Sequence, residues 1–178
     1  MAYYKPEEDL ENRIIIRNPL SSEEIGILMT GEEAENRLSD NENPAALSIE
    51  KWKRMQKLIS ILSKKTDPEF FYPDLIYFIG YKTCALCLNS IEQYELKYGI
   101  QKYKENRCLM CPLRKIDCCL DTSSAFNKIV YLLEGKVSSK IKPGIDFSSI
   151  SSAERLKMID DAILKMIENL KMIKGSKF

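Results

Sequence analysis

Two long segments of the chain repeat hydrophobic residues at the three- and four-residue intervals of an α-helix. The first covers residues 45–65, and its repeating residues are Trp52, Met55, Ile59 and Leu62. The second covers residues 152–174, and its repeating residues are Leu156, Ile159, Ile163, Met166, Leu170 and Ile173. Because a helix usually buries its hydrophobic face, the pattern predicts two helices packed as an antiparallel pair, although such a face could instead form a groove for a partner.

Residues that favour helix ends accompany these segments. Asn43-Pro44 is a suitable start for the first helix, and Ser151-x-x-Glu154 has the capping-box form before the last. Shorter helices are predicted over residues 89–98 and 122–134. The predicted fold class is therefore mainly α, with little β structure.

The first part of the chain is strongly acidic. Residues 1–50 hold twelve acidic and four basic residues, a net charge of −8, whereas the remainder has a net charge of +9. Residues 1–44 also lack a long helical repeat, so they are predicted to form an acidic, loosely structured leader. Residues 45–178 are predicted to form one helical domain that contains a cysteine-rich module.

Composition favours an intracellular protein. Of the 178 residues, 44% are hydrophobic and 30% charged, and no stretch approaches the roughly 18 apolar residues of a membrane span. The first residues are acidic, unlike those of a secretory signal. We therefore expect a cytoplasmic protein with no membrane partner, whose thiols are free or bound to metal. The pattern leaves the oligomeric state open.

Six cysteines lie within 36 residues, from Cys84 to Cys119. Cys84-x2-Cys87 and Cys108-x2-Cys111 are separated by twenty residues, which is the spacing of a four-thiolate zinc site. Because Zn²⁺ accepts four cysteine sulfurs in tetrahedral geometry, these four cysteines are predicted to bind a structural zinc ion around which the helices pack. Cys118 could replace one of them. Since Cys118 and Cys119 are adjacent, at least one of the two is predicted to be a buried thiol.

Other chemistry is less favoured. Cys111-Pro112 suggests an iron–sulfur cluster, but the Cys-x2-Cys-x2-Cys run of bacterial ferredoxins is absent. The chain has no histidine, and its seven glycines are isolated, which removes the commonest general base and a phosphate-binding loop. An all-cysteine zinc site also has no open position for a reactive water. We therefore expect a protein that is not an enzyme.

A basic stretch supports an alternative. Between Lys82 and Lys115 there are seven basic and three acidic residues, with several tyrosines among them. Such a surface could bind nucleic acid through charge and base stacking, although it could equally be a solvated face, and the pI of about 7.5 is low for a dedicated binder. The candidate contact residues are Lys102, Tyr103, Lys104, Arg107, Arg114 and Lys115.

The order of these features resembles a group of small cysteine-rich, zinc-knuckle accessory proteins of tailed phages and other prokaryotic viruses. The matching stretches are Ala46-Leu-Ser-Ile-Glu-Lys-Trp52, Cys84-Ala-Leu-Cys87, Cys108-Leu-Met-Cys-Pro-Leu113, Cys118 and the helix over 152–174. The resemblance covers residues 45–178 and departs after Cys118, where Cys119-Leu-Asp replaces a small-Pro-Tyr segment. It implies a viral accessory protein with a bound metal.

Together these observations predict a non-enzymatic, zinc-stabilised binding protein. If it is viral, it would bind and inhibit a host defence complex, a protein or ribonucleoprotein, in the host cytoplasm. The acidic residues of the leader could then compete for a nucleic-acid-binding groove on that target; they include Glu7, Glu8, Asp9, Glu23, Glu24, Glu32 and Glu33. The alternative is a zinc-dependent nucleic-acid-binding protein, such as a transcription regulator.

Overall fold

The computed structural model describes residues 20–64, 74–99, 108–134 and 150–174. Its helices are α1 (Ser22–Ile27), α2 (Gly31–Ser39), α3 (Pro44–Leu62), α4 (Asp74–Ile79), the 3-10 helix η1 (Tyr81–Thr83), α5 (Ala85–Tyr98), the 3-10 helix η3 (Pro112–Lys115), α7 (Ala125–Glu134) and α8 (Ser152–Lys174). Within these ranges the protein contains no strand, and the prediction of a mainly α fold is confirmed. Over the same ranges, none of the helices combines the length and apolar character needed to cross a membrane.

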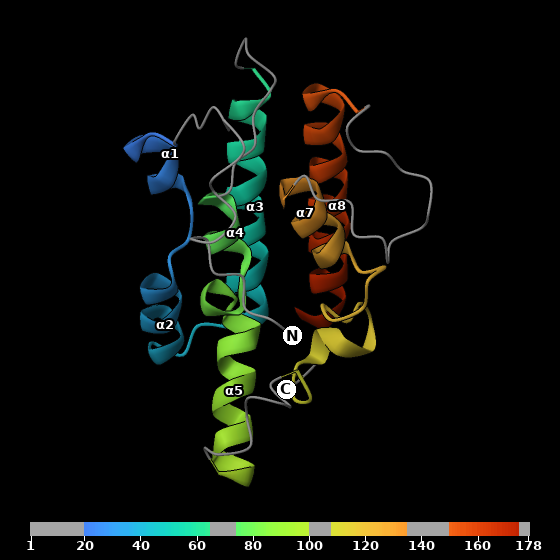
Figure 1. The fold of residues 1–178 in the computed structure, drawn as a ribbon. Coiled ribbons are helices and arrows are strands. Elements are labelled where there is room, and N and C mark those ends of the chain that lie inside the picture. The colour runs from blue at the N-terminus through green and yellow to red at the C-terminus, as the bar shows by residue number, and fades with distance from the viewer. Residues whose placement is uncertain (1–19, 65–73, 100–107, 135–149, 175–178) are drawn as a thin grey trace, which may run out of the picture.

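The two predicted long helices form the centre of the fold. Helices α3 and α8 lie side by side and run in opposite directions, with α7 packed against α8 (Figure 1). The predicted start signals are present: the Asn43 side chain accepts a hydrogen bond from the Ala46 amide at 2.9 Å, and the Ser151 hydroxyl accepts one from Glu154 at 3.2 Å. Local sequence thus determines where both helices begin.

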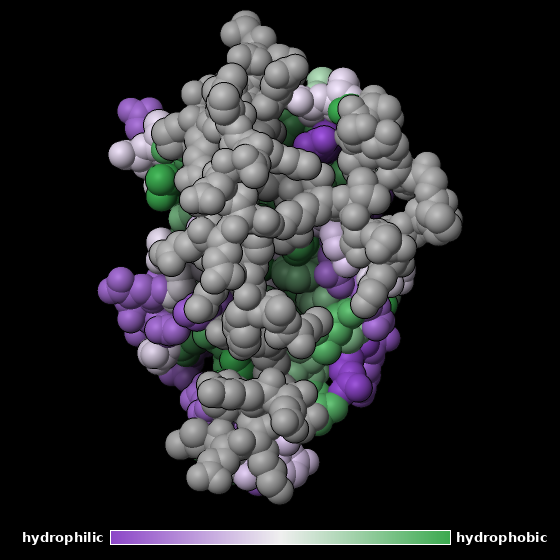
Figure 2. Space-filling view, in the orientation of Figure 1, coloured by the Kyte–Doolittle hydropathy of each residue, from purple (hydrophilic) through white to green (hydrophobic). Residues whose placement is uncertain are grey.

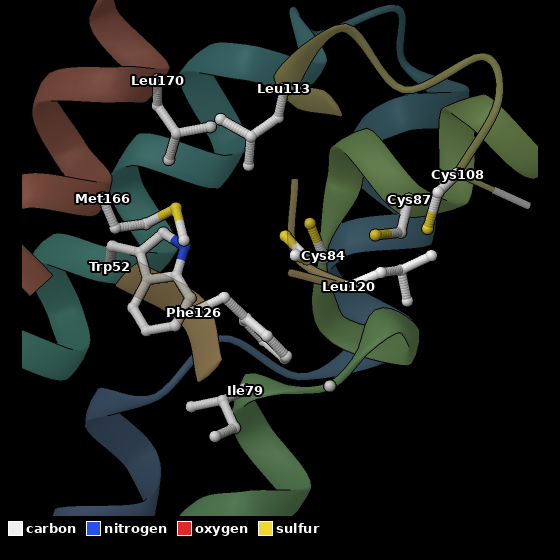
Figure 3. Close-up of a pocket in the computed structure, with 12 residues that line it drawn as sticks. Trp52, Ile79, Cys84, Cys87, Cys108, Leu113, Leu120, Phe126, Met166 and Leu170 are labelled. Carbon is white, nitrogen blue, oxygen red and sulfur yellow. The ribbon is translucent and has the colours of Figure 1, made fainter. Parts of the chain in front are cut away.

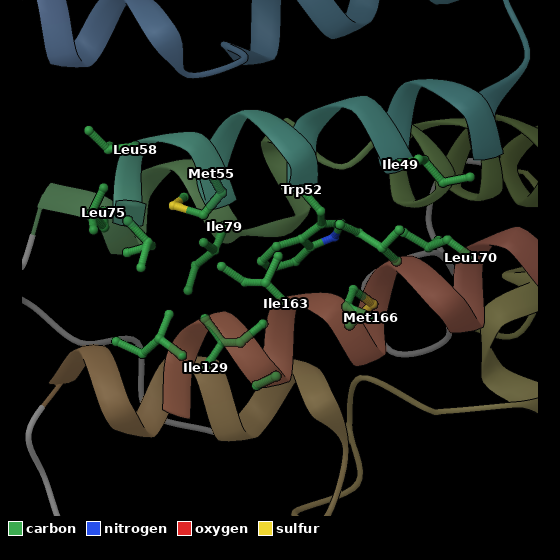
Figure 4. Close-up of a cluster of buried hydrophobic side chains, with 14 of the residues drawn as sticks. Ile49, Trp52, Met55, Leu58, Leu75, Ile79, Ile129, Ile163, Met166 and Leu170 are labelled. Carbon is green, nitrogen blue, oxygen red and sulfur yellow. The ribbon is translucent and has the colours of Figure 1, made fainter. Parts of the chain in front are cut away.

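The hydrophobic stripes of α3 and α8 face each other in the core. Figure 4 shows Trp52 and Met55 of α3 directed toward Ile163 and Met166 of α8, with Ile129 of α7 closing the far side. The Trp52 ring also meets the Phe126 ring edge-to-face, with centroids 6.5 Å apart. Since these side chains are buried, the two stripes form the core of the fold and not an open groove. Burying each side chain of this size contributes roughly 1.5–3 kcal/mol to stability.

Residues 20–43, which belong to the predicted leader, include two short helices. They form α1 and α2, and Met29 and Ala34 are buried in a small cluster with Leu47 of α3 and Ala85 of α5. The two helices have only 6 and 9 residues, so neither is long enough to show a hydrophobic repeat in the sequence. The rest of the predicted leader, residues 1–19, lies outside the described residues.

An ion-pair network joins α2 to α3. Arg37 of α2 contacts Glu50 of α3 at 2.9 Å and Glu42 at 2.7 Å, and Arg54 of α3 contacts Glu33 of α2 at 2.7 Å. Hydrophilic residues accordingly gather over α2 at the left of Figure 2. Part of the acidic charge of the predicted leader is therefore neutralised within the fold.

Two shorter helices begin at other residues than predicted. Helix α5 starts at Ala85 rather than 89, so Cys84 precedes its first turn and Cys87 lies within it. Helix α7 starts at Ala125 rather than 122, because Ser124 accepts the Asn127 amide proton and Asp117 accepts the Ala125 amide proton. The sequence does not reveal the contribution of Asp117, since it lies eight residues before the helix.

Candidate metal centre

Four cysteines from two separate parts of the chain line one cavity. Cys84 and Cys87 come from the start of α5, and Cys108 and Cys119 come from residues 108–121, which we name the cysteine segment. The cavity has a volume of about 180 Å³. Figure 3 shows the thiols of Cys84, Cys87 and Cys108 on one side of it, and Trp52, Phe126 and Met166 on the other. The site is therefore a set of thiols at the edge of the apolar core.

Three of the four predicted ligands line this cavity, namely Cys84, Cys87 and Cys108. The fourth, Cys111, is buried in the core next to them and interacts electrostatically with Cys84, Cys87 and Cys108. Neither Cys111 nor Cys118, the predicted substitute, is among the residues that line the cavity. Cys119 lines the cavity in their place. The spacing of the motif could not indicate this, because adjacent cysteines in a turn point in different directions and the sequence does not show which one faces the core.

None of the six cysteines forms a disulfide. Over the four ranges that the structure describes, no three His, Cys, Asp or Glu side chains are grouped closely enough to hold a metal ion. The cysteines thus have the chemistry that zinc prefers, and their thiols share a cavity, but they do not form a ligating cluster. A bound zinc ion at this site remains a prediction.

Helix α5 is positioned by a residue of α3. The Ser48 hydroxyl oxygen accepts a hydrogen bond from the Leu86 amide at 3.2 Å, while Cys84 makes no capping hydrogen bond of its own. The Ser48 oxygen is also 3.9 Å from the Cys84 sulfur. Ser48 is fully buried, so this contact fixes the first cysteine pair to the central helix of the core.

The cysteine segment is attached to the core by two polar side chains. The Asn127 side chain of α7 donates hydrogen bonds to the carbonyls of Cys119, at 2.8 Å, and Asp121, at 2.7 Å. Asp117 accepts one from the buried Asn169 side chain of α8 at 2.8 Å. These bonds hold the backbone around Cys119 against α7 and α8.

A buried lysine lies close enough to the thiols to interact with them electrostatically. Lys51 of α3 is 2% exposed; its ammonium donates to the Gly80 carbonyl at 3.3 Å and lies 5.3 Å from the centre of the Trp52 ring. Burial lowers the pKa of Lys51, and the negative charges of Cys84, Cys87 and Cys119 oppose that shift. Burial thus disfavours the charged form of Lys51, and negative charge on the cysteines would favour it.

The surroundings of the cysteines shift the pKa values of their thiols in different directions. A hydrogen bond with the Cys87 thiol, together with the charge of Lys51, lowers the pKa of Cys84 to about 5, while the same bond raises the pKa of Cys87. Burial raises the pKa of Cys111 to about 11 and also raises the pKa of Cys119. Cys84 is therefore the thiol of this group that most readily becomes a thiolate, the form that binds metal.

The residues predicted to contact nucleic acid are only partly described. Arg114 and Lys115 are exposed on η3, beside the cysteines. Tyr94, one of the tyrosines considered for stacking, is buried with its ring 4.7 Å from that of Tyr98, so it is not available to a base. The remaining candidates lie outside the described residues: Lys102, Tyr103, Lys104 and Arg107.

The acidic residues of α1 and α2 have two different roles. Glu24 is buried and accepts the Ser21 amide proton, and Glu33 pairs with Arg54, so both act within the fold. Glu23 and Glu32 are exposed. The three acidic residues Glu7, Glu8 and Asp9 lie outside the described residues.

No protein-family model, curated protein or solved structure matches this chain. The residues described above are therefore the basis for a functional proposal. The most distinctive of them are the four cysteines that share one cavity and the buried Lys51, which interacts electrostatically with three of them.

Proposed function

We propose that this protein is a non-enzymatic binding protein whose helices are held together by a structural zinc ion on cysteine side chains. The observation that carries the proposal is that cysteines of α5 and of the cysteine segment line one cavity beside the buried Lys51. Zinc bound there would cross-link two parts of the chain and add its binding free energy to folding. Sites of this all-thiolate kind are coordinatively closed, so their role is structural.

The remaining lining of the cavity supports a structural role. Apart from Gly80 and the four cysteines, the lining consists of Trp52, Ile79, Leu113, Leu120, Phe126, Met166 and Leu170. These side chains offer no general acid or base, and the chain contains no histidine. An apolar cavity with thiols on one side suits a bound metal better than a hydrolytic reaction.

A partner surface is the second part of the proposal. The cysteine segment exposes the apolar side chains of Leu109, Met110, Ile116 and Leu120, which we name the exposed patch. Hydrophobic residues are visible at the lower right of Figure 2, where this segment lies. Because the patch adjoins the cysteines, zinc binding would order the surface that meets a partner protein.

The resemblance to viral accessory proteins supplies the biological setting. A viral protein of this kind would act in the host cytoplasm by occupying a surface of a host defence complex, with one copy for each target. Its exposed acidic residues, including Glu23 and Glu32 of α1 and α2, could compete there for a groove that normally binds nucleic acid.

Metal content tests the zinc proposal directly. We expect the full chain, purified under reducing conditions, to contain about one zinc ion per molecule by elemental mass spectrometry. A strong chelator should then lower its melting temperature, because the binding free energy of zinc is lost. Metal-free protein that keeps its melting temperature in the chelator would contradict the proposal.

The partner proposal needs a matched comparison. The full chain and a variant with Leu109→Asp and Ile116→Asp are used to recover partners from host lysate, and Ile25→Asp on α1, at the opposite side of the fold, is the control. We expect the patch variant to lose the partner while the native chain and the Ile25→Asp control retain it. Equal recovery by all three proteins would remove the exposed patch from the mechanism.

The nucleic-acid alternative is favoured by one observation, the exposure of Arg114 and Lys115 on η3 next to the cysteines. It predicts salt-sensitive binding of single- or double-stranded nucleic acid, weakened when both residues are replaced by alanine. A mobility-shift titration at two salt concentrations measures this. Binding weaker than about micromolar at low salt would leave the protein-partner proposal in place.

A further inference from the structure

The cysteine-lined cavity has a second, apolar side whose chemistry the zinc-stabilised role does not use. The described residues of this side come from α3, α4, η3, α7 and α8, and they are Trp52, Ile79, Leu113, Phe126, Met166 and Leu170. We propose that this side of the cavity is a binding site for a small, uncharged aromatic molecule. The inference goes beyond the zinc-stabilised role and does not depend on it.

The size of the cavity limits the ligand. Its volume is about 180 Å³. An apolar cavity of about 150 Å³ inside a protein is large enough to hold one benzene molecule, whereas drug-sized ligands occupy pockets of about 300–1,000 Å³. The site therefore accommodates one benzene ring with a small substituent and excludes larger ring systems.

The lining of the cavity disfavours charged ligands. None of the described lining residues has a charged side chain, and Trp52 is the only one whose side chain contains a nitrogen or oxygen atom. Lys51 is not among them, and its ammonium donates to the Gly80 carbonyl at 3.3 Å. A charged group that entered the cavity would lose its hydration without gaining an ion pair in return. The ligand is therefore uncharged.

The same lining favours an aromatic ligand over an aliphatic one. The rings of Trp52 and Phe126 both line the cavity, and they meet edge-to-face with centroids 6.5 Å apart. A further ring is able to pack against either of them, and contacts of this kind strengthen association about 2–10-fold beyond the effect of buried area. Sulfur atoms of Met166 and of four cysteines also line the cavity, and sulfur packs favourably against the edge of an aromatic ring.

The cavity has an accessible end and a closed end. Leu120 lies on the thiol side in Figure 3 and is 50% exposed, so the cavity reaches the surface there. On the opposite side Trp52 is 3% exposed, and Met166 and Leu170 are fully buried. A ligand that enters beside Leu120 would therefore come to rest against the Trp52 ring.

Trp52 makes this site directly observable, because it is the only tryptophan of the chain. Bromobenzene is an uncharged aromatic molecule whose heavy atom quenches indole fluorescence on contact. We expect it to quench the Trp52 fluorescence of the full chain saturably, with a Kd below about 1 mM. Toluene should reverse the quenching by competition, and cyclohexane should compete about 2–10-fold less well.

A charged analogue is the matched control. 4-Bromobenzoate has the same ring and heavy atom as bromobenzene but carries a carboxylate, so it should not quench the buried Trp52. Bromobenzene quenching that is absent or does not saturate would overturn the proposal. Saturable quenching by 4-bromobenzoate of equal strength would overturn it as well, and equal competition by cyclohexane and toluene would contradict the aromatic preference.

A pair of variants locates the bound ligand. Leu113→Phe places a larger side chain in the cavity and should weaken bromobenzene binding at least about tenfold, because a close-packed site has no spare room. Leu109→Phe makes the same change in the same segment, at a 47% exposed residue outside the lining, and should leave binding unchanged. Unchanged binding in a folded Leu113→Phe variant would overturn the proposal.

Melting of the native chain decides the matter if Leu113→Phe does not fold. A ligand that binds only the folded state raises the melting temperature, so saturating toluene should raise that of the native chain. A melting temperature that toluene leaves unchanged would count against the site.

Metal content measured on the same sample separates this inference from the zinc-stabilised role. Zinc-containing protein that fails to bind bromobenzene would remove the ligand site and leave the zinc-stabilised role in place. Metal-free protein that binds bromobenzene through Trp52 would support the ligand site alone.

Discussion

The hydroxyl of Ser48, on α3, accepts a hydrogen bond from the amide of Leu86, in the first turn of α5, at a distance of 3.2 Å. One helix thereby caps another, because Cys84 at the N-cap position of α5 makes no capping hydrogen bond. The same oxygen lies 3.9 Å from the Cys84 sulfur. Ser48 thus joins the core helix to the helix start that carries the first cysteine pair.

Replacing Ser48 by alanine should destabilise the protein by about 1–2 kcal/mol. The variant leaves the buried Leu86 amide without its acceptor, which is the usual cost of losing an N-cap. Ser60→Ala, on the exposed side of the same helix, should change the free energy of unfolding by less than about 0.5 kcal/mol. Denaturant unfolding of both variants measures the difference, and equal stabilities would show that Ser48 does not cap α5.

Gly31 begins α2 where the backbone of η1 approaches closely. A Cβ atom at this position would lie 2.7 Å from the Lys82 carbonyl oxygen, so Gly31→Ala must separate α2 from η1. We expect a loss of about 1–3 kcal/mol, as in other overpacked sites. Gly26→Ala in α1, where the space is open, should instead stabilise by up to about 1 kcal/mol. Thermal unfolding distinguishes the two, and a tolerated Gly31→Ala would contradict the close approach.

Adjacent residues of α8 should respond very differently to truncation. Ile163 is 0% exposed in the core, so Ile163→Ala should cost about 2–5 kcal/mol by leaving a cavity. Leu164 is 44% exposed, and Leu164→Ala should change stability by less than about 0.5 kcal/mol. Denaturant midpoints check this prediction, and similar losses at both positions would mean that α8 buries a different face.

The network around Arg37 predicts a stability that falls in acid. Hydrogen bonding to Arg37 lowers the pKa values of Glu42 and Glu50 below the ordinary carboxyl value. These carboxylates bind protons less readily in the folded state than in the unfolded state. Their contribution to stability is therefore fully present at pH values above the ordinary carboxyl pKa, and it is lost as the pH falls through their lowered pKa values.

The Arg37→Met variant tests the network. Its melting temperature should depend less on pH than that of the native chain between about pH 5 and pH 3. Glu32→Gln, on the exposed face of the same helix, should leave the native pH dependence unchanged. If the native chain and Arg37→Met lose stability in parallel through this range, the ion pairs do not contribute.

The sequence predicted some, but not all, of the residues in and around the cysteine-lined cavity. Cys84, Cys87 and Cys108 were predicted from spacing alone, because two Cys-x2-Cys pairs place thiols at the ends of tight turns. Cys119 was missed, since its position depends on the turn held by Asn127 of α7. Lys51 was also missed, because the sequence places it on a helix next to Trp52 and says nothing of the thiols that approach from α5.

The sequence by itself determined the two long helices, because hydrophobic periodicity and end caps are local features. The hydrophobic repeats that contain Trp52 and Ile163 predict α3 and α8. The capping residues Asn43 and Ser151 mark where these helices begin. Only the tertiary structure decided how short acidic helices pack on α3 and which cysteines share a cavity. Those outcomes depend on contacts between residues far apart in the chain, such as Arg54 with Glu33 and Ser48 with Leu86. Such contacts carry no periodic signal, so they become visible only when the helices are in place.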